Sequence, residues 1–397
     1  MELRYKNILL RDFRTVKDGV VINFNIGTAA HCPGTLAVLK KYLPPEVKIT
    51  VWADAPLAPD LAEMMRRRFP EVPIVWGDLE NNPSQALLNA VDEADLFLIS
   101  SGSTIAGSVR VTMEQFQDRT GKPAAAYGIG CTAPLLPWID RLEFAWLRDP
   151  VAAEIAEASS CPIKGRAPDA VFDFDAVDHE SAEKFMQTYC LTPGKFICCI
   201  PGHRNTPRWR YFGTPANMEK EAINAEFQEH DNAPLREIIR VAVEEFGLKV
   251  LICPEQITEI DLIRPIVYDK LPLEIRKHCV PMDEIWTPDT ALGVYRASRG
   301  VFGVEMHSQV MAVGSGVPGV LLRHPMFGSK SEMWKTIELP EWLIHTEDPD
   351  YAAKAVAAVR NILADSEGTS AKLRRARQII DQANCDAIER SFFRCSQ

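Results

Sequence analysis

The chain has 397 residues, of which 46% are hydrophobic and 25% charged, and its formal net charge is −10. One hydrophobic core stops growing at about 250–300 residues, so we expect two domains. The acidic balance excludes a general attraction to nucleic-acid phosphates, and no uncharged apolar run approaches the ~18 residues that a membrane span needs.

The N-terminal residues and the cysteines indicate the compartment and the redox state that we expect. The start, MELRYKNILLRDF, lacks the apolar core of a signal peptide. The ten cysteines form no Cys-x-x-Cys pair and no cluster with zinc spacing. We therefore expect a cytoplasmic protein with reduced thiols, without a metal or a cofactor. The sequence leaves a homo-oligomer open.

Short apolar runs alternate with amphipathic stretches, which is typical of parallel sheets covered by helices on both faces. The pattern predicts an α/β protein of two doubly wound, Rossmann-like domains, 1–175 and 190–345, facing a cleft. Helices in 346–397 are expected to pack back on the first domain. The expected strands are 20–26, 48–54, 95–101, 124–130, 195–201, 249–255 and 300–305, and the expected helices include 86–94, 114–121, 235–247 and 311–316.

In open parallel sheets, ligands bind beyond the carboxyl ends of the strands. The stretch NIGTAAH follows the first expected strand and supplies Asn25, Gly27, Thr28 and His31. Gly27 allows a tight turn, and Thr28 can cap a helix whose N-terminal amides would face an anion. A plain helix cap explains the same residues equally well.

A second turn of small residues, Ser101, Gly102 and Ser103, follows the strand 95–101. Its backbone amides could hold a phosphate or a carboxylate. The turn has neither the Gly-Lys-Ser/Thr element of a P-loop nor the Gly-x-Gly-x-x-Gly pattern, so by itself it is a weak signal.

In the second domain, PGHRNTPRWRYFG follows the strand 195–201 and contains His203, Arg204, Arg208, Trp209 and Arg210. Guanidinium groups match carboxylates and phosphates, and aromatic faces suit sugar rings. Such a run of charge is often only a solvated face. Directly after a buried strand in an acidic protein, it favours an anion or sugar site.

The next strand end is PEQITEID, where Glu255 and Gln256 come first. They could bind hydroxyl groups or provide an acid and a base. Glu259 and Asp261 fit a helix cap equally well, because acids complement a helix N-terminus.

The last strand end, EMHS, contains Glu305, His307 and Ser308. A helix N-terminus favours the neutral form of a histidine, which is a usable general base near pH 7. A structural histidine is the commoner case. Because polar neighbours flank it and small residues follow it, His307 is the best catalytic candidate.

These strand ends, in this order, resemble the polysaccharide pyruvyl transferase family over roughly residues 20–345. EMHSQVMAVGSGVPGVLL (305–322) is the most specific match, and NIGTAAH, LISSGSTIAG, AYGIGCTAP and APDAVFDF are similar to other family segments. WLRDPVAAEIAE matches a family helix start at Arg148 and Asp149. The resemblance implies a GT-B-like fold and transfer of a pyruvyl group from phosphoenolpyruvate to a glycan or glycolipid sugar, with a carbohydrate as partner.

One departure from the family pattern affects the chemistry. Glu305 stands where the family usually carries the arginine of an Arg-x-His motif, and a carboxylate there repels an anionic donor. Arg204, Arg208 or Arg210 would then have to hold phosphoenolpyruvate. Two alternatives stay open: hydrolysis or elimination on a sugar by Glu305, His307 and Glu255, or a sugar-binding protein without catalysis.

Overall fold

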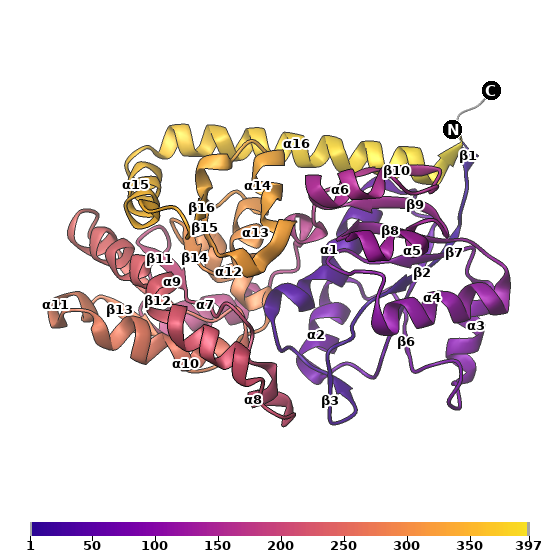
Figure 1. Ribbon diagram of the computed structural model, residues 1–397, viewed down its shortest axis with the longest axis horizontal. Helices are drawn as coiled ribbons and strands as arrows, with labels where there is room; N and C mark the ends of the chain where they lie inside the picture. The colour runs from indigo at the N-terminus through magenta and orange to yellow at the C-terminus, as the bar shows by residue number, and fades with distance from the viewer. Residues whose placement is uncertain (1, 395–397) are drawn as a thin grey trace. The chain divides into compact units, whose positions relative to one another are not determined.

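Two parallel sheets, each with its own helices, organise the residues 2–394 that the computed structural model describes (Figure 1). Unit 1 comprises the described residues within 1–23, 28–176 and 378–397, and unit 2 comprises 24–27 and 177–377. The fold class predicted from the sequence, two doubly wound α/β bodies, is confirmed. None of the helices among the described residues combines the length and apolarity that crossing a membrane requires.

The sheet of unit 1 has seven strands in the order β10-β9-β8-β7-β2-β5-β6, all paired in parallel. The chain proceeds outward from β2 to one edge and then returns to β7, so the order reverses between β2 and β7. The strands are β2 (Asn7–Arg11), β5 (Lys48–Ala53), β6 (Ile74–Trp76), β7 (Leu96–Ile99), β8 (Ala124–Ile129), β9 (Leu142–Leu147) and β10 (Ile163–Arg166). The helices are α1 (Ile26–Tyr42), α2 (Pro59–Arg68), α3 (Gln85–Glu93), α4 (Gly107–Thr120), α5 (Leu136–Ile139) and α6 (Pro150–Ala156).

Two small two-stranded sheets complete unit 1. One pairs β3 (Val16–Lys17) with β4 (Val20–Val21), and the other pairs β1 (Glu2–Leu3) with β17 (Phe393–Arg394), so the two ends of the chain lie together.

The sheet of unit 2 has six parallel strands in the order β13-β12-β11-β14-β15-β16, and its order reverses between β11 and β14. The strands are β11 (Phe196–Ile200), β12 (Lys249–Ile252), β13 (Cys279–Pro281), β14 (Val301–Gly303), β15 (Gly319–Arg323) and β16 (Leu343–His345). The helices are α7 (His179–Thr188), α8 (Arg208–Phe212), α9 (Met218–Glu244), α10 (Ile260–Leu262), α11 (Leu273–Arg276), α12 (Pro288–Ala297), α13 (His307–Gly314), α14 (Met333–Thr336) and α15 (Tyr351–Ala364). Helix α16 (Ser366–Phe392) contributes its first part to unit 2 and its last part to unit 1.

The central strands are apolar along their whole length. Every residue of β7 (LFLI), β8 (AAAYGI) and β11 (FICCI) is buried. An antiparallel sheet with one wet face would alternate apolar and polar residues instead. Because these strands are buried on both faces, the polar side chains lie beyond the strand ends.

The first expected strand, 20–26, is wrong. Only Val20 and Val21 form a strand, in the small hairpin with β3, and Ile26 already begins α1. The first strand of the large sheet is β2, a short NILLR segment between charged residues. Residues 24–27 instead belong to unit 2, where Ile26 N donates to Glu255 O and Ile257 N donates to Phe24 O, both at 3.0 Å.

Candidate functional site

Three of the predicted residues meet at the carboxyl edge of the unit 2 sheet. Glu255 follows β12, and His307 and Ser308 follow β14, on either side of β11. Glu255 Oε1 lies 3.3 Å from His307 Nδ1, and Glu255 Oε2 accepts the Ser308 N–H at 2.7 Å. Because an ionised carboxylate only accepts hydrogen bonds, this contact assigns the imidazole proton to Nδ1 and makes Nε2 the basic nitrogen.

Residues at the start of α1 and just before it also belong to unit 2, and they contact Glu255 and His307. Asn25 Nδ2 donates to Glu255 Oε1 at 3.5 Å, and Asn25 forms an isolated antiparallel bridge with Gln256. A Cβ atom added to Gly27 would lie 2.2 Å from His307 Cβ. Only glycine at position 27 therefore allows the backbone to pack against His307.

Two further carboxyl groups are buried beside the pair. Glu259 is fully buried and Glu305 is 6% exposed. Glu259 Oε2 accepts the backbone N–H groups of Glu255 at 2.7 Å and Gln256 at 3.1 Å. The sequence assigned Glu259 to a helix cap, and it does form a capping box with Gln256, but its place next to Glu305 was not foreseen.

The surroundings of Glu255, Glu259 and Glu305 shift the pKa values of these three carboxyl groups in different directions. Burial, and then the negative charge of Glu255, raises the pKa of Glu305 to about 8. Burial also raises the pKa of Glu259 well above its usual value, with Glu305 and Glu255 adding to the effect. Burial acts in the same direction on Glu255, but His307 and Ser308 together outweigh it and lower its pKa. One ionised carboxylate thus lies among two groups that favour the protonated form.

The loop after β11 differs from the open cationic cluster that the sequence suggested. Arg204 binds Asp231 through two contacts of 2.6 and 2.9 Å. Arg210 pairs with Glu221, which also accepts from Trp209 Nε1 at 2.7 Å. These three side chains are engaged in contacts within unit 2.

Arg208 is the exception in this loop. Its guanidinium group lies over the Phe24 ring at 5.1 Å, and within residues 2–394 it has no ion pair with a carboxylate. Burial lowers the pKa of Arg208, yet a guanidinium keeps its charge at neutral pH. Arg208 is therefore a cation whose charge no carboxylate of the described residues pairs with.

Hydrogen bonds hold His203 and the backbone of this loop in place. His203 Nε2 contacts Thr258 O at 3.1 Å, and burial lowers the pKa of this histidine. The Asn232 side chain on α9 accepts from Gly202 N at 3.0 Å and donates to Gly202 O at 3.1 Å. Asn224 holds the Asn205 backbone in the same two-way manner, at 2.9 and 2.7 Å. The loop is therefore a preorganised part of the site.

In unit 1, the predicted small-residue turn forms a buried polar network. Ser101 Oγ lies 3.2 Å from Asp169 Oδ1, and Asp169 also pairs with Arg148 at 3.0 Å and His31 at 3.5 Å. A Cβ atom on Gly102 would lie 2.0 Å from His31 Nε2. Arg148 and the Pro-Asp turn are similar to family segments, but Asp169 was not among the candidate site residues.

Two of the amides that the sequence suggested for an anion already donate within unit 1. Ser101 N donates to Thr35 Oγ1 at 3.3 Å and Gly102 N donates to Gly128 O at 3.0 Å. Ser103 Oγ accepts from Arg14 Nη2 at 2.8 Å. Thr28, expected as an N-cap, is the third residue of α1, because the helix already begins at Ile26.

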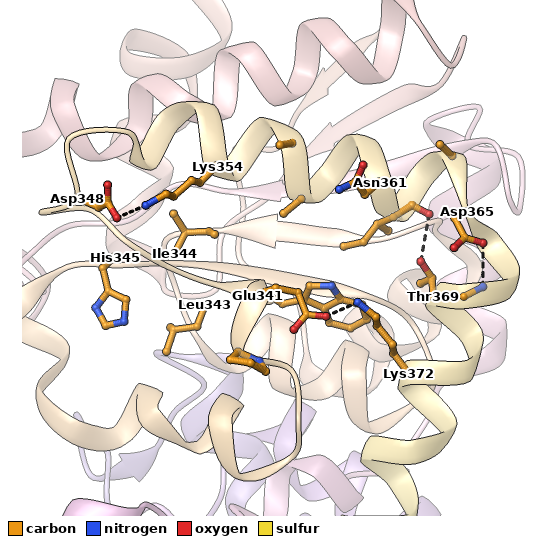
Figure 2. Close-up of a pocket in the computed structure, with 17 residues that line it drawn as sticks. Glu341, Leu343, Ile344, His345, Asp348, Lys354, Asn361, Asp365, Thr369 and Lys372 are labelled. Carbon is orange, nitrogen blue, oxygen red and sulfur yellow. Dashed lines mark hydrogen bonds and ion pairs between the residues drawn. The ribbon is translucent and has the colours of Figure 1, made fainter.

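A separate cavity of about 740 Å³ lies in unit 2 between the edge strand β16, α15 and the beginning of α16 (Figure 2). Its floor includes Leu343 and Ile344, and its charged groups pair with one another, Lys354 with Asp348 and Lys372 with Glu341. None of the predicted site residues lines it. This cavity and the cluster of Glu255, Glu305 and His307 are therefore in different places.

Comparisons with known proteins agree on the fold. No family model and no curated protein matches this sequence. Among solved structures, ADP-heptose LPS heptosyltransferase II of E. coli has a TM-score of 0.53 at 12% identity, covering 91% of this chain and 99% of that one. HepE of Anabaena in complex with UDP and glucose has 0.55 at 9% identity, covering 97% and 98%. UDP-GlcNAc 2-epimerase of Neisseria meningitidis bound to UDP-GlcNAc has 0.54 at 11% identity, covering 96% and 98%. The chain has the GT-B fold.

Proposed function

We propose that this chain is a carbohydrate-active enzyme whose acid–base residues are His307, oriented by Glu255, and Glu305. The contact of 3.3 Å between Glu255 and His307, beside a carboxyl group with a pKa of about 8, carries the proposal. Solved structures of similar fold include a heptosyltransferase and an enzyme bound to UDP-GlcNAc. That likeness supports a sugar substrate and leaves the reaction to the site.

The roles follow from the protonation states. Glu255 holds the Nδ1 proton of His307, so Nε2 can take a proton from a substrate hydroxyl. Glu305 is largely protonated near pH 7 because its pKa is raised, and it can give a proton. Two groups with separated pKa values can act as acid and base at one pH.

Pyruvyl transfer from phosphoenolpyruvate is the first candidate reaction. Its C3 gains a proton, two sugar hydroxyls form bonds to C2, and phosphate leaves with one of the hydroxyl protons. In this scheme Glu305 supplies the C3 proton and His307 takes a hydroxyl proton. Arg208 favours this reaction, because it is a cation without a carboxylate partner among the described residues, and it would hold the acid groups of the donor.

Elimination or hydrolysis at a sugar is the second candidate. It is favoured by the acidic character of the site, where Glu255 already accepts the Ser308 N–H at the start of α13. A phosphate at that helix end would have to displace a carboxylate. A substrate whose reacting part is uncharged meets no such competition.

Calorimetry with phosphoenolpyruvate tests the first candidate on the wild type, Arg208→Ala and a control, Arg240→Ala, whose arginine pairs only on the surface of α9. Micromolar binding that is lost in Arg208→Ala and kept in the control supports pyruvyl transfer. The same proteins are then incubated with UDP-GlcNAc and with neutral glycans in D₂O and followed by NMR. Deuterium uptake or cleavage without phosphoenolpyruvate binding supports the second candidate. No binding and no turnover with any of these contradicts the proposed function.

A further inference from the structure

His324 follows β15, the strand next to β14, and so lies at the same carboxyl edge as Glu305 and His307. It is 2% exposed, and neither ring nitrogen has a hydrogen-bond partner within residues 2–394. Burial lowers its pKa to about 4, so the ring is neutral at pH 7. Buried polar groups are nearly always paired in native proteins, so an imidazole with two such nitrogens calls for a partner outside the described residues, a water or a ligand.

The ring is held in place by apolar contact. His324 stacks on Phe327, with ring centroids 4.2 Å apart and an angle of 18° between the planes. The segment after it is fixed to Arg323, which donates to Gly328 O at 2.9 Å and to Ser331 Oγ at 3.0 Å. The position of His324 is therefore built into unit 2 without using its nitrogens.

The surroundings of His324 overlap with those of Glu305. The positive charge of Lys330 acts on both residues, and the Arg204–Asp231 pair also acts on His324. Lys330 lies over the Phe327 ring at 4.7 Å. A group bound at His324 would therefore lie at the same edge of the sheet as the proposed acid–base residues, one strand away.

The chemistry of a neutral imidazole selects its ligand. One nitrogen donates and the other accepts, which matches a hydroxyl group, since a hydroxyl both donates and accepts. A carboxylate or phosphate only accepts, and an ammonium group only donates. We infer that His324 is a binding residue for hydroxyl groups on an uncharged part of the sugar substrate. This inference rests on the proposed function and adds a subsite to it.

His324→Phe tests the inference, because phenylalanine keeps the stacking on Phe327 and removes both nitrogens. Stability should be unchanged or higher, since no internal hydrogen bond is lost. His203→Phe is the matched control, and it should be less stable because His203 Nε2 contacts Thr258 O. A clear loss of stability in His324→Phe would overturn the inference, because it would reveal an internal partner.

Ligand contact is measured on the whole protein with ¹⁵N-labelled histidine rings, using glucose and N-acetylglucosamine as probes and the two phenylalanine variants to assign signals. The expected result is a shift of the His324 nitrogen signals and at least tenfold weaker sugar binding in His324→Phe. If the His307 signals respond and those of His324 do not, the inference fails and the proposed function stands. If neither responds to glucose or N-acetylglucosamine, this inference fails, and the proposed function fails as well only if phosphoenolpyruvate, UDP-GlcNAc and the neutral glycans also give no binding and no turnover.

Discussion

Glu305 decides the electrostatics of the site at the scale of single residues. An arginine at this position would hold an anion, whereas a buried carboxyl beside Glu255 keeps its proton instead. A carboxyl group at this position therefore weakens a site for an anion and provides a group that can donate a proton. Under the proposed function, it is this group that would act as the acid at neutral pH.

The raised pKa of Glu305 predicts a pH-dependent stability. Between the unfolded pKa of 4.5 and the folded value of about 8, the native state binds more protons than the unfolded state. Stability should therefore fall as pH rises through this window, by up to about 1.4 kcal/mol per pH unit. Glu305→Gln should reduce this slope in urea unfolding measured from pH 5 to 8.5. The exposed Glu274→Gln should leave it unchanged, and equal slopes in all three proteins would contradict the assigned protonation.

For the Glu255→Gln variant we predict an effect on turnover instead of an effect on the pH dependence of stability. The amide preserves the shape of the side chain but removes the charge that supports a protonated His307. A lost acid–base contribution lowers rates by about 10²–10⁴-fold, and we expect kcat to fall within that range in the assay that identifies the substrate. Glu259→Gln, which removes a carboxyl that does not contact His307, should cost much less. Similar losses in both variants would argue against a specific Glu255–His307 pair.

At the scale of elements, helix α9 shows how a helix tolerates a proline in its middle. Pro234 has no N–H, so the carbonyl four residues earlier, His230 O, loses its helical partner. Tyr351, at the start of α15, donates its hydroxyl to this carbonyl at 2.6 Å. The carbonyl is satisfied from another helix, and α9 continues to Glu244.

This contact predicts a double-mutant cycle. Tyr351→Phe should lower the free energy of unfolding by about 0.5–1 kcal/mol, because His230 O loses a donor in a contact that is exposed to solvent. In a Pro234→Ala background, the alanine N–H replaces that donor, and the cost of Tyr351→Phe should nearly vanish. Urea unfolding of the four proteins measures the coupling. Equal costs in both backgrounds would show that Tyr351 acts through packing alone.

The same elements show what the sequence could predict. Continuously buried runs such as β7, β8 and β11 were found because burial on both faces leaves a continuous signal. The stretch 20–26 is interrupted by Asn23 and Asn25 and is not a strand beyond Val21, because Ile26 already begins α1. Ile26 N donates to Glu255 O, a partner that local patterns do not reveal. Glu255, His307 and Ser308 were candidates because they follow β12 and β14, and the structure brings them into contact, while their catalytic roles stay a prediction.

Ion pairs between residues that are distant in the chain could not be predicted from the sequence. Arg204 and Arg210 were predicted to face a ligand, yet their partners Asp231 and Glu221 are on α9, 27 and 11 residues later. Nothing local indicates which acid meets which arginine. The two unpaired nitrogens of His324 are visible only once its surroundings are known, since a lone histidine after a strand is unremarkable by pattern.

At the scale of the whole molecule, the chain builds two sheets, each with its own apolar core, and passes between the units more than once. Residues 24–27 leave unit 1 to join unit 2, and α16 begins in unit 2 and ends in unit 1. The site in unit 2 thus depends on a segment that is distant in sequence, which pins Glu255 and His307 from the other side. Residues that are neighbours in this site are therefore far apart along the chain.

Separate cores predict separate unfolding transitions in calorimetry of the full chain. Leu98 in β7 and Leu321 in β15 are both fully buried, one in each sheet. Leucine-to-alanine changes at such positions cost about 2–5 kcal/mol. Leu98→Ala should lower the melting temperature of one transition and Leu321→Ala that of the other, because each removes contacts from one core only. If both variants shift a single common transition by the same amount, the crossing segments couple the units into one cooperative body, and the exchange of residues 24–27 and of α16 would be the physical reason.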